Sequence, residues 1–422
     1  LLGEVHENPE ILESEELDRL ISEHAIKCPT CQSTEWKSAR PMSLMFETRI
    51  GAMGGSRTAY MRPETAQGMF MLFPVLYRHF RQKLPFGALQ TGKGYRNEIS
   101  PRQGMIRLRE FNMAELEFFI DPDHPPEANL ERWGQRVCMV PNEEDSSEGG
   151  IGMTLGEAFD DGIVKHPTVA WFLAMTLEFL IKVGIDPSKI RFRQHEDTEM
   201  AHYASDCWDC EIHGEHGWVE VVGIANRTCH DLESHERHSG SNLLRAWRTF
   251  DSPVSEVKEV LSPVGSVVGP TFRDKASQVS QALSELSDMP DGFPFTLTLS
   301  DGTEVEISDE MVSRSTIDSV TNGEYFTPHV IEPAFGIDRI IWHILDHGYQ
   351  EIEKEEEDYT ILRLNPSIAP YDVAILPLFD KDGMGVLANE ISETISSIPG
   401  IIGIKDTSRS IGRRYARSDE IG

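Results

Sequence analysis

The sequence predicts an α+β fold. Residues 90–119 are expected to form two strands around a loop, because apolar and polar residues alternate on either side of a centre rich in turn residues. An apolar helix is expected at 167–183, and strands are expected at 190–195 and 217–223. From residue 369 onward a strand, a helix and a second strand follow one another. The turn residues of the first hairpin are Gly92, Gly94, Ser100, Pro101 and Gly104.

The length of 422 residues allows a large core and predicts two or three domains. With 39% hydrophobic and 26% charged residues, the chain is expected to be soluble and globular. It has no run of about 18 apolar residues that could span a bilayer and no secretory signal, so we expect a cytoplasmic protein without a membrane partner. The start at Leu1 without Met, and the end at Gly422 before a sheet could be completed, predict a chain truncated at both ends.

The net charge of −31 argues against the basic surface that most RNA-binding proteins show. The chain contains 12 Lys and 27 Arg against 70 Asp and Glu. This acid-rich and Lys-poor balance is similar to that of halophilic proteins, which stay soluble in strong brine because salt screens their self-repulsion. Six cysteines in so long a chain do not form a disulfide framework, which indicates a reducing compartment.

The first elements are an acidic amphipathic helix predicted at 7–27 and a Cys28-x2-Cys31 turn. This pair is a candidate half of a zinc site, with Cys207 and Cys210 as the other half. Two unligated thiols beside a turn are the more common alternative. A second possible zinc site consists of Cys207, Cys210, His213 and His216, which are each three residues apart. These side chains could equally face solvent.

Charge is concentrated in the predicted hairpin at 90–119. Its guanidinium groups are suited to phosphate oxygens and its carboxylates to amines, which is the combination needed for the ATP-driven activation of an amino acid. A solvated hairpin with cross-strand salt bridges is the alternative. The charged residues are Arg96, Arg102, Arg107 and Arg109, and Glu98, Glu110, Glu115 and Glu117.

The remaining segments are expected to alternate between regular and irregular structure. A strand at 44–51 precedes a long apolar helix that should extend through Arg81. Residues 121–162 should form loops with a short helix, and residues 225–232 a turn. Residues 246–320 differ in composition and contain a predicted hairpin around Asp301, whereas residues 327–342 predict a strand, a Gly turn and a helix whose start favours an anion.

Three segments, in this order, resemble the signature motifs of class II aminoacyl-tRNA synthetases. The region 44–86 resembles motif 1, Tyr95-Arg-Asn-Glu98 with the returning Arg109, Phe111 and Glu115 resembles motif 2, and Gly336-Ile-Asp-Arg339 resembles motif 3. More narrowly, three strings are similar to glycyl-tRNA synthetases of archaea and eukaryotes, and this resemblance covers nearly all of residues 28–422. The strings are Arg62-Pro-Glu-Thr-Ala-Gln-Gly68, Arg96-Asn-Glu-Ile-Ser-Pro-Arg102 and Ala201-His-Tyr-Ala-Ser-Asp-Cys-Trp-Asp209.

The resemblance implies an antiparallel class II sheet flanked by helices, with ATP, Mg²⁺, glycine and tRNA(Gly) as partners and a homodimer formed through the motif 1 helix. A zinc ion at the weak candidates Cys28, Cys31, Cys207 and Cys210 is possible but not favoured. The residues implied to bind ATP are Arg96, Asn97, Glu98, Arg107, Leu108, Phe111, Glu220, Val221 and Arg339, of which Arg96, Glu98 and Arg339 are the catalytic group. Those implied to bind glycine are Glu64, Glu115, Glu332, Pro333 and Ala334. Two positions depart from the family pattern, Ala334 where many members have Ser and Asp338 where several have Gly.

The resemblance also implies a division into domains. Residues 1–245 and 321–368 form the two parts of the catalytic domain, 246–320 form an insertion module, and 369–422 form the start of an α/β anticodon-binding domain. Two alternatives remain, which are a class II synthetase for another small amino acid and a non-catalytic, nucleic-acid-binding relative of the fold. The second alternative should have lost Arg96, Glu98 or Arg339, and all three are present.

Overall fold

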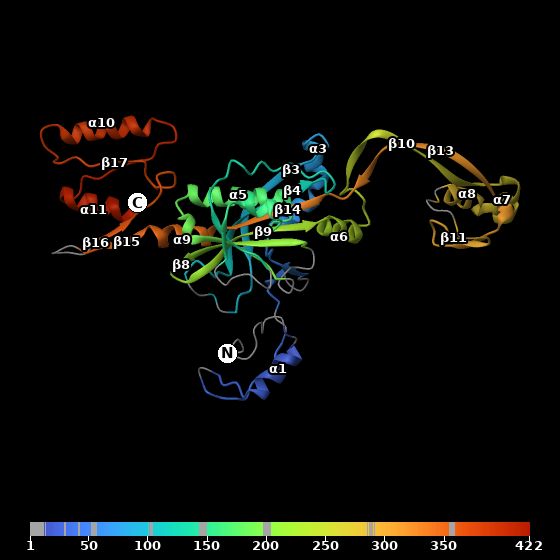
Figure 1. Cartoon of the computed structure of the whole chain (residues 1–422), viewed down its shortest axis with the longest axis horizontal. Coiled ribbons are helices and arrows are strands. Elements are labelled where there is room, and N and C mark those ends of the chain that lie inside the picture. Colours follow the sequence, from blue (N-terminus) through green and yellow to red (C-terminus); the bar gives the residue numbers. More distant parts are fainter. Residues whose placement is uncertain are drawn as a thin grey trace. The chain divides into compact units, whose positions relative to one another are not determined.

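The computed structural model describes residues 12, 14–28, 31–40, 43–51, 57–99, 101, 104–142, 150–196, 204–284, 286, 290, 292–353 and 359–422, apart from the side chains of 256–259 and 317–319. The chain divides into two compact units, Arg245–Phe326 and the rest of the chain (Figure 1). No helix in the described ranges is both long and apolar enough to cross a bilayer.

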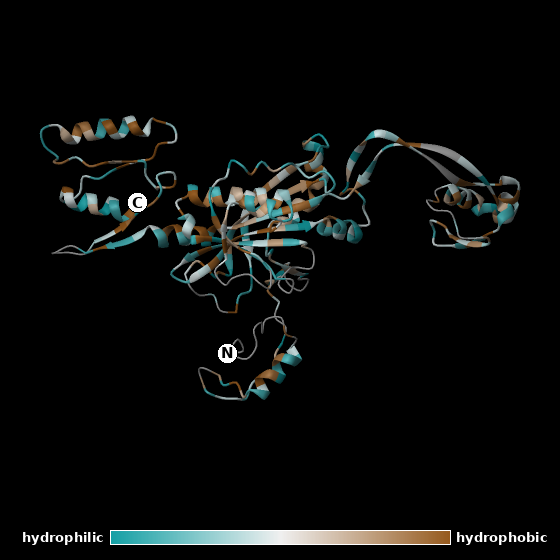
Figure 2. Ribbon diagram, in the orientation of Figure 1, coloured by the Kyte–Doolittle hydropathy of each residue, from teal (hydrophilic) through white to brown (hydrophobic). Residues whose placement is uncertain are grey.

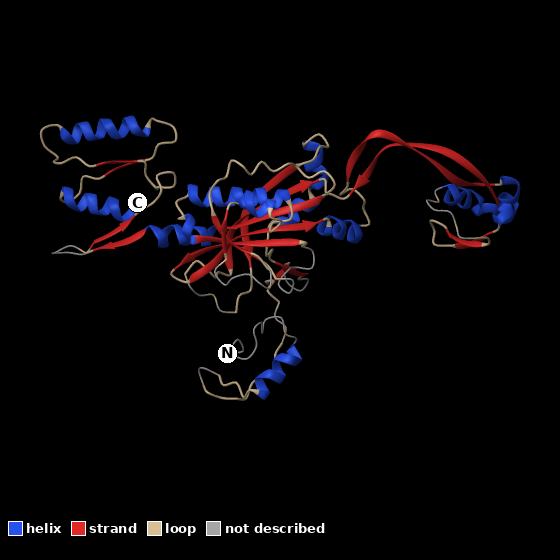
Figure 3. Cartoon of the chain, in the orientation of Figure 1, coloured by secondary structure: helices blue, strands red, loops and turns tan. Residues whose placement is uncertain are grey.

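The larger unit is built on an eight-stranded sheet (Figure 3). All of its neighbouring strands are antiparallel except β5 and β7, which are parallel. The prediction of an α+β fold with a mainly antiparallel sheet is therefore confirmed. The strand order is β3 (Phe86–Tyr95), β4 (Glu110–Ile120), β14 (His329–Gly336), β9 (Gly217–Thr228), β8 (Asp206–Gly214), β7 (Ile190–Gln194), β5 (Val137–Val140) and β6 (Ile151–Met153).

Strands β3 and β4 form the hairpin predicted at 90–119, with Gln90 opposite Glu115. Alternate side chains of a strand point to opposite faces. In β4 the buried set includes Met113, Glu115 and Glu117, while the residues between them are only half-buried. Two carboxylates therefore lie on the buried face of the strand, where an unpaired charge is costly.

Helix α5 (Pro167–Lys182) confirms the helix predicted at 167–183 and packs against β9 and β14. Nine of its sixteen residues are buried, which agrees with its apolar sequence. Pro167 begins the helix, where its missing N–H is not needed. The His166 side chain caps the helix by accepting a hydrogen bond from the backbone N–H of Thr168 (3.2 Å).

The region of motif 1 differs from the single long helix that was predicted to extend through Arg81. It contains two short helices, α2 (Ala66–Met71) and α3 (Phe73–His79), which are separated at Leu72. Pro74 lies in the first turn of α3, and a proline cannot donate the hydrogen bond that would continue α2. Arg81 and Gln82 then take positive φ angles of 57°, which ends helical structure before β3.

Two further predictions of irregular structure were wrong. Residues 121–162, predicted as loops with a short helix, contribute β5 and β6 to the sheet in addition to α4 (Leu155–Asp160). The turn predicted at 225–232 is the end of β9 followed by α6 (His230–Ser239). Figure 2 shows α6 as hydrophilic along its length, which explains why no apolar periodicity indicated a helix there.

The second unit, Arg245–Phe326, has a core of its own. Two long strands, β10 (Ala246–Pro263) and β13 (Val312–Phe326), pair with each other. Between them lie α7 (Gly265–Phe272), α8 (Ala276–Ser284) and the short hairpin of β11 (Phe295–Thr298) and β12 (Glu304–Ile307). The hairpin predicted around Asp301 is therefore confirmed. The core consists of Leu261, Val268, Val279, Leu283, Leu297, Leu299, Ile307 and Val312.

The terminal segments contain smaller elements. Helix α1 (Ser14–Glu23) lies within the helix predicted at 7–27, of which residues 7–11 and 13 fall outside the described ranges. Strands β1 (Glu47–Ile50) and β2 (Arg57–Tyr60) pair, as do β15 (Tyr349–Ile352) and β16 (Tyr359–Leu362).

The strand, helix and strand predicted after residue 369 are present as β17 (Val373–Ile375), α10 (Met384–Ser396) and β18 (Gly403–Lys405), and the two strands are parallel. Helix α11 (Ile411–Ile421) follows. Its Arg414 is buried and donates hydrogen bonds to the backbone carbonyls of Ser408, Thr407, Arg409 and Pro377. Arg414 therefore holds the preceding turn together.

Candidate active site

A cavity of about 310 Å³ lies over the sheet in the larger unit. Its floor comes from β4, β14, β9 and β8, and one wall comes from the loop between β3 and β4. Helix α9 (Ile337–Gly348) begins at its edge, where Asp338 and Arg339 line the cavity.

The structure brings together twelve of the fourteen residues predicted to bind ATP or glycine. They come from four sequence segments that are more than 200 residues apart at the extremes. The two exceptions are Asn97, whose backbone N–H donates to the carbonyl of Leu44 (2.7 Å), and Pro333, which lies on β14 between two residues that face the cavity. The twelve are Glu64, Arg96, Glu98, Arg107, Leu108, Phe111, Glu115, Glu220, Val221, Glu332, Ala334 and Arg339.

Arginine side chains define one end of the cavity. The Arg96 guanidinium lies 5.6 Å from the centre of the Phe111 ring, within the range of a cation–π contact. Arg339, in the first turn of α9, donates from Nε to the carbonyl of Ile106 (3.0 Å) and from Nη1 to the carbonyl of Glu220 (2.7 Å). Nη1 also lies 3.2 Å from Glu220 Oε2. Arg339 thus lines the cavity beside a helix N-terminus that itself favours anions.

The other end of the cavity is acidic and contains a buried arginine that the sequence analysis missed. Arg227 on β9 lies 2.7 Å from Glu332 Oε2 through Nη1 and 2.8 Å from Asp231 Oδ2 through Nε. Glu64 is more distant, at 3.9 Å from the same Nη1. Burial opposes the charge of Arg227, but the carboxylates of Glu332 and Asp231 outweigh it and raise the pKa of the guanidinium. Its position at the end of a mostly apolar stretch, next to Asn226 in β9, was the signal that could have identified it.

Glu115 differs from Glu332 and Asp231 because no cation among the described residues lies within ion-pairing distance of it. Its Oε2 accepts hydrogen bonds from the backbone N–H and the hydroxyl of Thr65, both at 2.5 Å. Burial, followed by the nearby Glu332 carboxylate, raises the pKa of Glu115 to about 7. The cavity thus holds a carboxylate that would gain from a positively charged ligand.

Glu117, one step further along the buried face of β4, is fully shielded from solvent. Burial and the adjacent Glu332 carboxylate raise its pKa well above the ordinary value for glutamate. The raised pKa favours the protonated form of Glu117. Arg227 is the one cation that pairs with Glu332 and Asp231 in the described network, and it forms no ion pair with Glu115.

The weak zinc candidates do not come together as proposed. Cys207 lines the cavity, whereas Cys210 is buried in the hydrophobic core. The two side chains leave β8 on opposite faces because they are three residues apart in a strand, so they cannot bind the same ion. Cys28 and Cys31 lie in a turn after α1, and neither belongs to any group of potential metal ligands in the described part of the chain.

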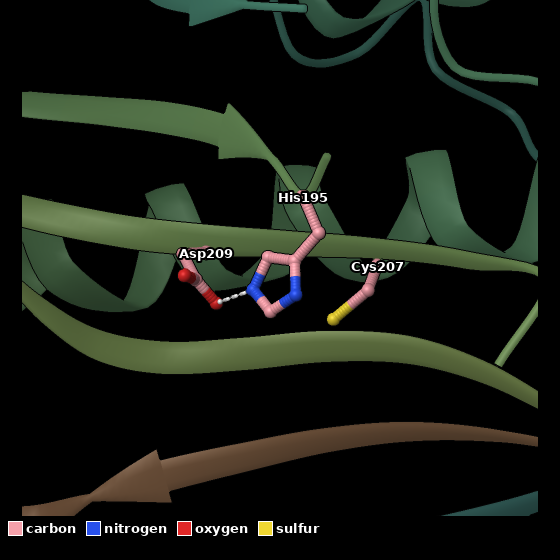
Figure 4. Close-up of side chains that lie close together, drawn as sticks. All are labelled: His195, Cys207 and Asp209. Carbon is pink, nitrogen blue, oxygen red and sulfur yellow. Dashed lines mark ion pairs between the residues drawn. The ribbon is translucent and has the colours of Figure 1, made fainter. Parts of the chain in front are cut away.

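His195, Cys207 and Asp209 form a close group on the cavity wall (Figure 4). His195 Nε2 lies 2.9 Å from Asp209 Oδ1, and Arg193 Nη2 lies 3.1 Å from Asp209 Oδ2. Hydrogen bonds to Asp209 and then Cys207 raise the pKa of His195 to about 10. Asp209 thus lies between His195 and Arg193, and we interpret this group as a charge network.

The two departures from the family pattern have different consequences. Ala334 lines the cavity and offers no hydroxyl there. Asp338 is buried in the first turn of α9 and accepts hydrogen bonds from the backbone N–H of Asn112 (2.6 Å) and from Asn112 Nδ2 (2.9 Å). Asp338 therefore ties the helix that carries Arg339 to the β4 strand.

Comparison with known proteins identifies the family. Residues 52–133 match the family model for the tRNA synthetase class II core domain (G, H, P, S and T). The chain is 44% identical over 426 residues to the glycine–tRNA ligase of Methanothrix thermoacetophila, covering 100% of this chain and 73% of that protein. It is 45% identical over 424 residues to the glycine–tRNA ligase of Methanocaldococcus jannaschii, covering 96% and 72%.

Among solved structures, the Giardia lamblia prolyl-tRNA synthetase in complex with prolyl-adenylate aligns with a TM-score of 0.43 and 14% identity, over 89% of this chain and 52% of that one. The sequence identities to the two archaeal proteins are high and extend over nearly the whole chain, beyond the motifs that line the cavity. The chain therefore belongs to the glycine–tRNA ligase family of class II aminoacyl-tRNA synthetases.

Proposed function

We propose that the cavity activates glycine with ATP and transfers the glycyl group to the 3′ end of tRNA(Gly). The observation that carries this proposal is a single cavity with arginines at one end and an uncompensated buried carboxylate at the other. The glycine carboxylate oxygen attacks the α-phosphorus of ATP, and the bond to pyrophosphate breaks. A hydroxyl of the terminal tRNA adenosine then attacks the glycyl carbonyl, and AMP leaves. Neither step requires a protein nucleophile, because such transfers depend on positioning and on stabilising charge.

The arginine end is assigned to ATP. Arg96 would contact the α-phosphate, Arg107 and Arg339 the β and γ end, and Phe111 would stack on the adenine ring. The Glu98 and Glu220 carboxylates also line the cavity and offer oxygen ligands of the kind that Mg²⁺ prefers. When bound, Mg²⁺ would neutralise charge on the phosphates.

The acidic end is assigned to the ammonium group of glycine. The contacts of the two predicted partners favour Glu115 over Glu332, because Arg227 already pairs with Glu332 while Glu115 has only the neutral donors of Thr65. An ammonium group beside Glu115 would supply the missing cation. Glu64, at the edge of the same network, would complete the enclosure.

Selection of glycine over alanine is a problem of size. A pocket that encloses the ammonium group by contact leaves no room for a β-carbon, and rejection by steric clash can exceed the ~1–3 kcal/mol that a missing methylene provides. Ala334 would not weaken this rejection, since it removes a hydroxyl from the pocket wall and leaves the charges of Glu64, Glu115 and Arg227 in place.

The proposed homodimer would form through the motif 1 region. Helices α2 and α3 with β3 expose several large apolar side chains, which are unfavourable in water unless covered. These are Met71 (63% exposed), Leu72 (54%), Val75 (53%) and Leu89 (65%). We also propose a cytoplasmic location, an insertion module within Arg245–Phe326, and an anticodon-binding role for residues 369–422.

The decisive experiment is glycine-dependent exchange between ATP and pyrophosphate, measured in molar KCl and repeated with alanine and serine. It reports the first step alone and needs no tRNA. We expect exchange with glycine only, and its loss in Arg96→Ala and Arg339→Ala but not in Arg413→Ala, an exposed arginine of α11. Exchange with alanine or serine instead of glycine would support a synthetase for another small amino acid.

A further inference from the structure

Helix α9 carries a second group of polar side chains that does not line the cavity. His343, Asp346 and His347 are spaced i, i+3 and i+4, so they share one face of the helix. This face lies against the turn between β8 and β9, because Asp346 Oδ2 accepts a hydrogen bond from the backbone N–H of Glu215 (3.0 Å). Of the two histidines that the sequence analysis considered with Cys207 and Cys210, His213 lies near the end of β8 and His216 lies in this turn.

The ligand atoms of the three helix residues converge. One side-chain nitrogen or oxygen from each of His343, Asp346 and His347 lies within 4.8 Å of the others. The hydrogen bond between His347 Nε2 and the carbonyl of His213 (2.9 Å) requires the Nε2 proton, so the lone pair of this ring is on Nδ1. Nδ1 is buried and has no hydrogen-bond partner among the described residues. This pattern, one ring nitrogen fixed by a carbonyl and the other open, is typical of metal-binding histidines.

Of the three side chains, His343 has the most unsatisfied hydrogen-bonding groups. Its side chain is 0% exposed, and neither ring nitrogen has a hydrogen-bond partner within the described structure. Polar groups buried in this way are normally satisfied by protein, water or an ion. Both nitrogens of the His343 ring, together with Nδ1 of His347, are thus unsatisfied within the described structure.

Asp346 and His343 lie close to Gly214, where a side chain would leave them no room. A Cβ placed on Gly214 would come within 2.5 Å of Asp346 Oδ2 and 2.8 Å of His343 Nδ1. Any larger residue at 214 would therefore displace the two side chains. Because Gly214 has no side chain, Asp346 and His343 can both pack against the backbone at this position.

We propose that His343, Asp346 and His347 bind a Zn²⁺ ion that fastens the β8–β9 turn to helix α9. Two imidazoles and one carboxylate suit Zn²⁺ better than Mg²⁺ or Ca²⁺, which prefer oxygen ligands. Arg339 lies one helical turn before His343 on the same helix, so the ion would stabilise the element that carries a phosphate-binding residue. Its role would be structural, and the fourth ligand would be water.

The test uses the full chain, dialysed against a chelator and titrated with Zn²⁺ by calorimetry and with Co²⁺ by visible absorption. We expect one equivalent to bind, with Co²⁺ bands of a nitrogen- and oxygen-ligated site and a Zn²⁺-dependent rise in Tm. Asp346→Asn keeps an acceptor for the Glu215 N–H, and His347→Gln keeps a donor for the His213 carbonyl. Each should weaken binding at least tenfold.

His195→Gln is the matched control, because it removes a histidine from the other close group, His195, Cys207 and Asp209. Binding unchanged in this variant and lost in Asp346→Asn or His347→Gln supports the proposal. Absence of Zn²⁺ binding by the folded wild-type chain would overturn it. So would binding that persists in both α9 variants, or binding that His195→Gln abolishes.

Discussion

Glu115 should make the use of glycine depend on pH. Its pKa of about 7 in the glycine-free site means that a proton competes with the glycine ammonium for the same carboxylate. Free glycine keeps its ammonium charged at neutral pH, so only the enzyme group titrates. The apparent KM for glycine should therefore rise about tenfold between pH 8 and pH 6, as the ionised fraction of Glu115 falls to roughly a tenth.

Glu115→Gln should remove this dependence. The variant cannot offer a charged acceptor, and loss of a charge-assisted hydrogen bond of about 1.5–3 kcal/mol predicts a KM for glycine that is roughly 10- to 150-fold higher at pH 8 and flat with pH. The assay is glycine-dependent pyrophosphate exchange over this pH range. Glu110→Gln, on the exposed side of the same strand, is the matched control and should behave as wild type. A wild-type KM for glycine that is constant with pH, or a normal KM in Glu115→Gln, would refute the reasoning.

The same pKa shift has a consequence for stability. Because folding raises the pKa of Glu115 from 4.5 to about 7, the native state binds the proton more tightly than the unfolded state does. This group therefore lowers stability progressively as the pH rises through that window, and the loss should be smaller when glycine is present.

Three further predictions concern stability and can be checked by urea or thermal unfolding. Arg227→Met leaves the carboxylates of Glu332 and Asp231 buried without a cation, and should cost about 3–5 kcal/mol; a cost below 1 kcal/mol would contradict the proposed charge network. Asp338→Ala removes two hydrogen bonds to Asn112 and should cost about 1–3 kcal/mol, while an unchanged Tm would show that α9 is not held there. With a net charge of −31, the midpoint of unfolding should rise as KCl increases from about 0.1 M to 1 M, because the screening length falls from roughly 10 to 3 Å. A midpoint that falls over this range would argue against adaptation to brine.

The parts of the fold that the sequence predicted are those with strong local signals. The hairpin of β3 and β4 was predictable because turn residues separate two alternating segments, and α5 because sixteen residues in a row lack a helix breaker after Pro167. By contrast, β5 and β6 are only four and three residues long. Strands this short gain their stability from neighbours in the sheet, and that contribution is invisible in a local pattern.

In the region of α2 and α3 the sequence analysis predicted too much helix. A continuous apolar run suggested one long helix where the chain forms two short ones. The sequence around Leu72 and Pro74 is apolar on both sides, so the periodicity continued across a break that depends on the missing N–H of proline. The break separates Leu72 and Met71 from the core side of α3 and leaves both exposed.

Within the site, the sequence indicated which residues carry charge but not how the charges pair. Glu64, Glu115 and Glu332 appeared equivalent as three acids around one ammonium group. Tertiary contacts distinguish them, because Arg227 forms an ion pair with Glu332, while the Glu115 carboxylate accepts hydrogen bonds from Thr65. A pairing between β9 and β14 that spans 105 residues cannot be deduced from either strand alone.

The most direct test of the central claim is a crystal structure with the sulfamoyl analogue of glycyl adenylate. The account predicts one molecule in the cavity, with its ammonium group in hydrogen-bonding distance of the Glu115 carboxylate, its sulfamoyl oxygens beside Arg96, and its adenine ring on Phe111. An analogue bound elsewhere, or bound with its ammonium group facing Arg227 and away from Glu115, would contradict it.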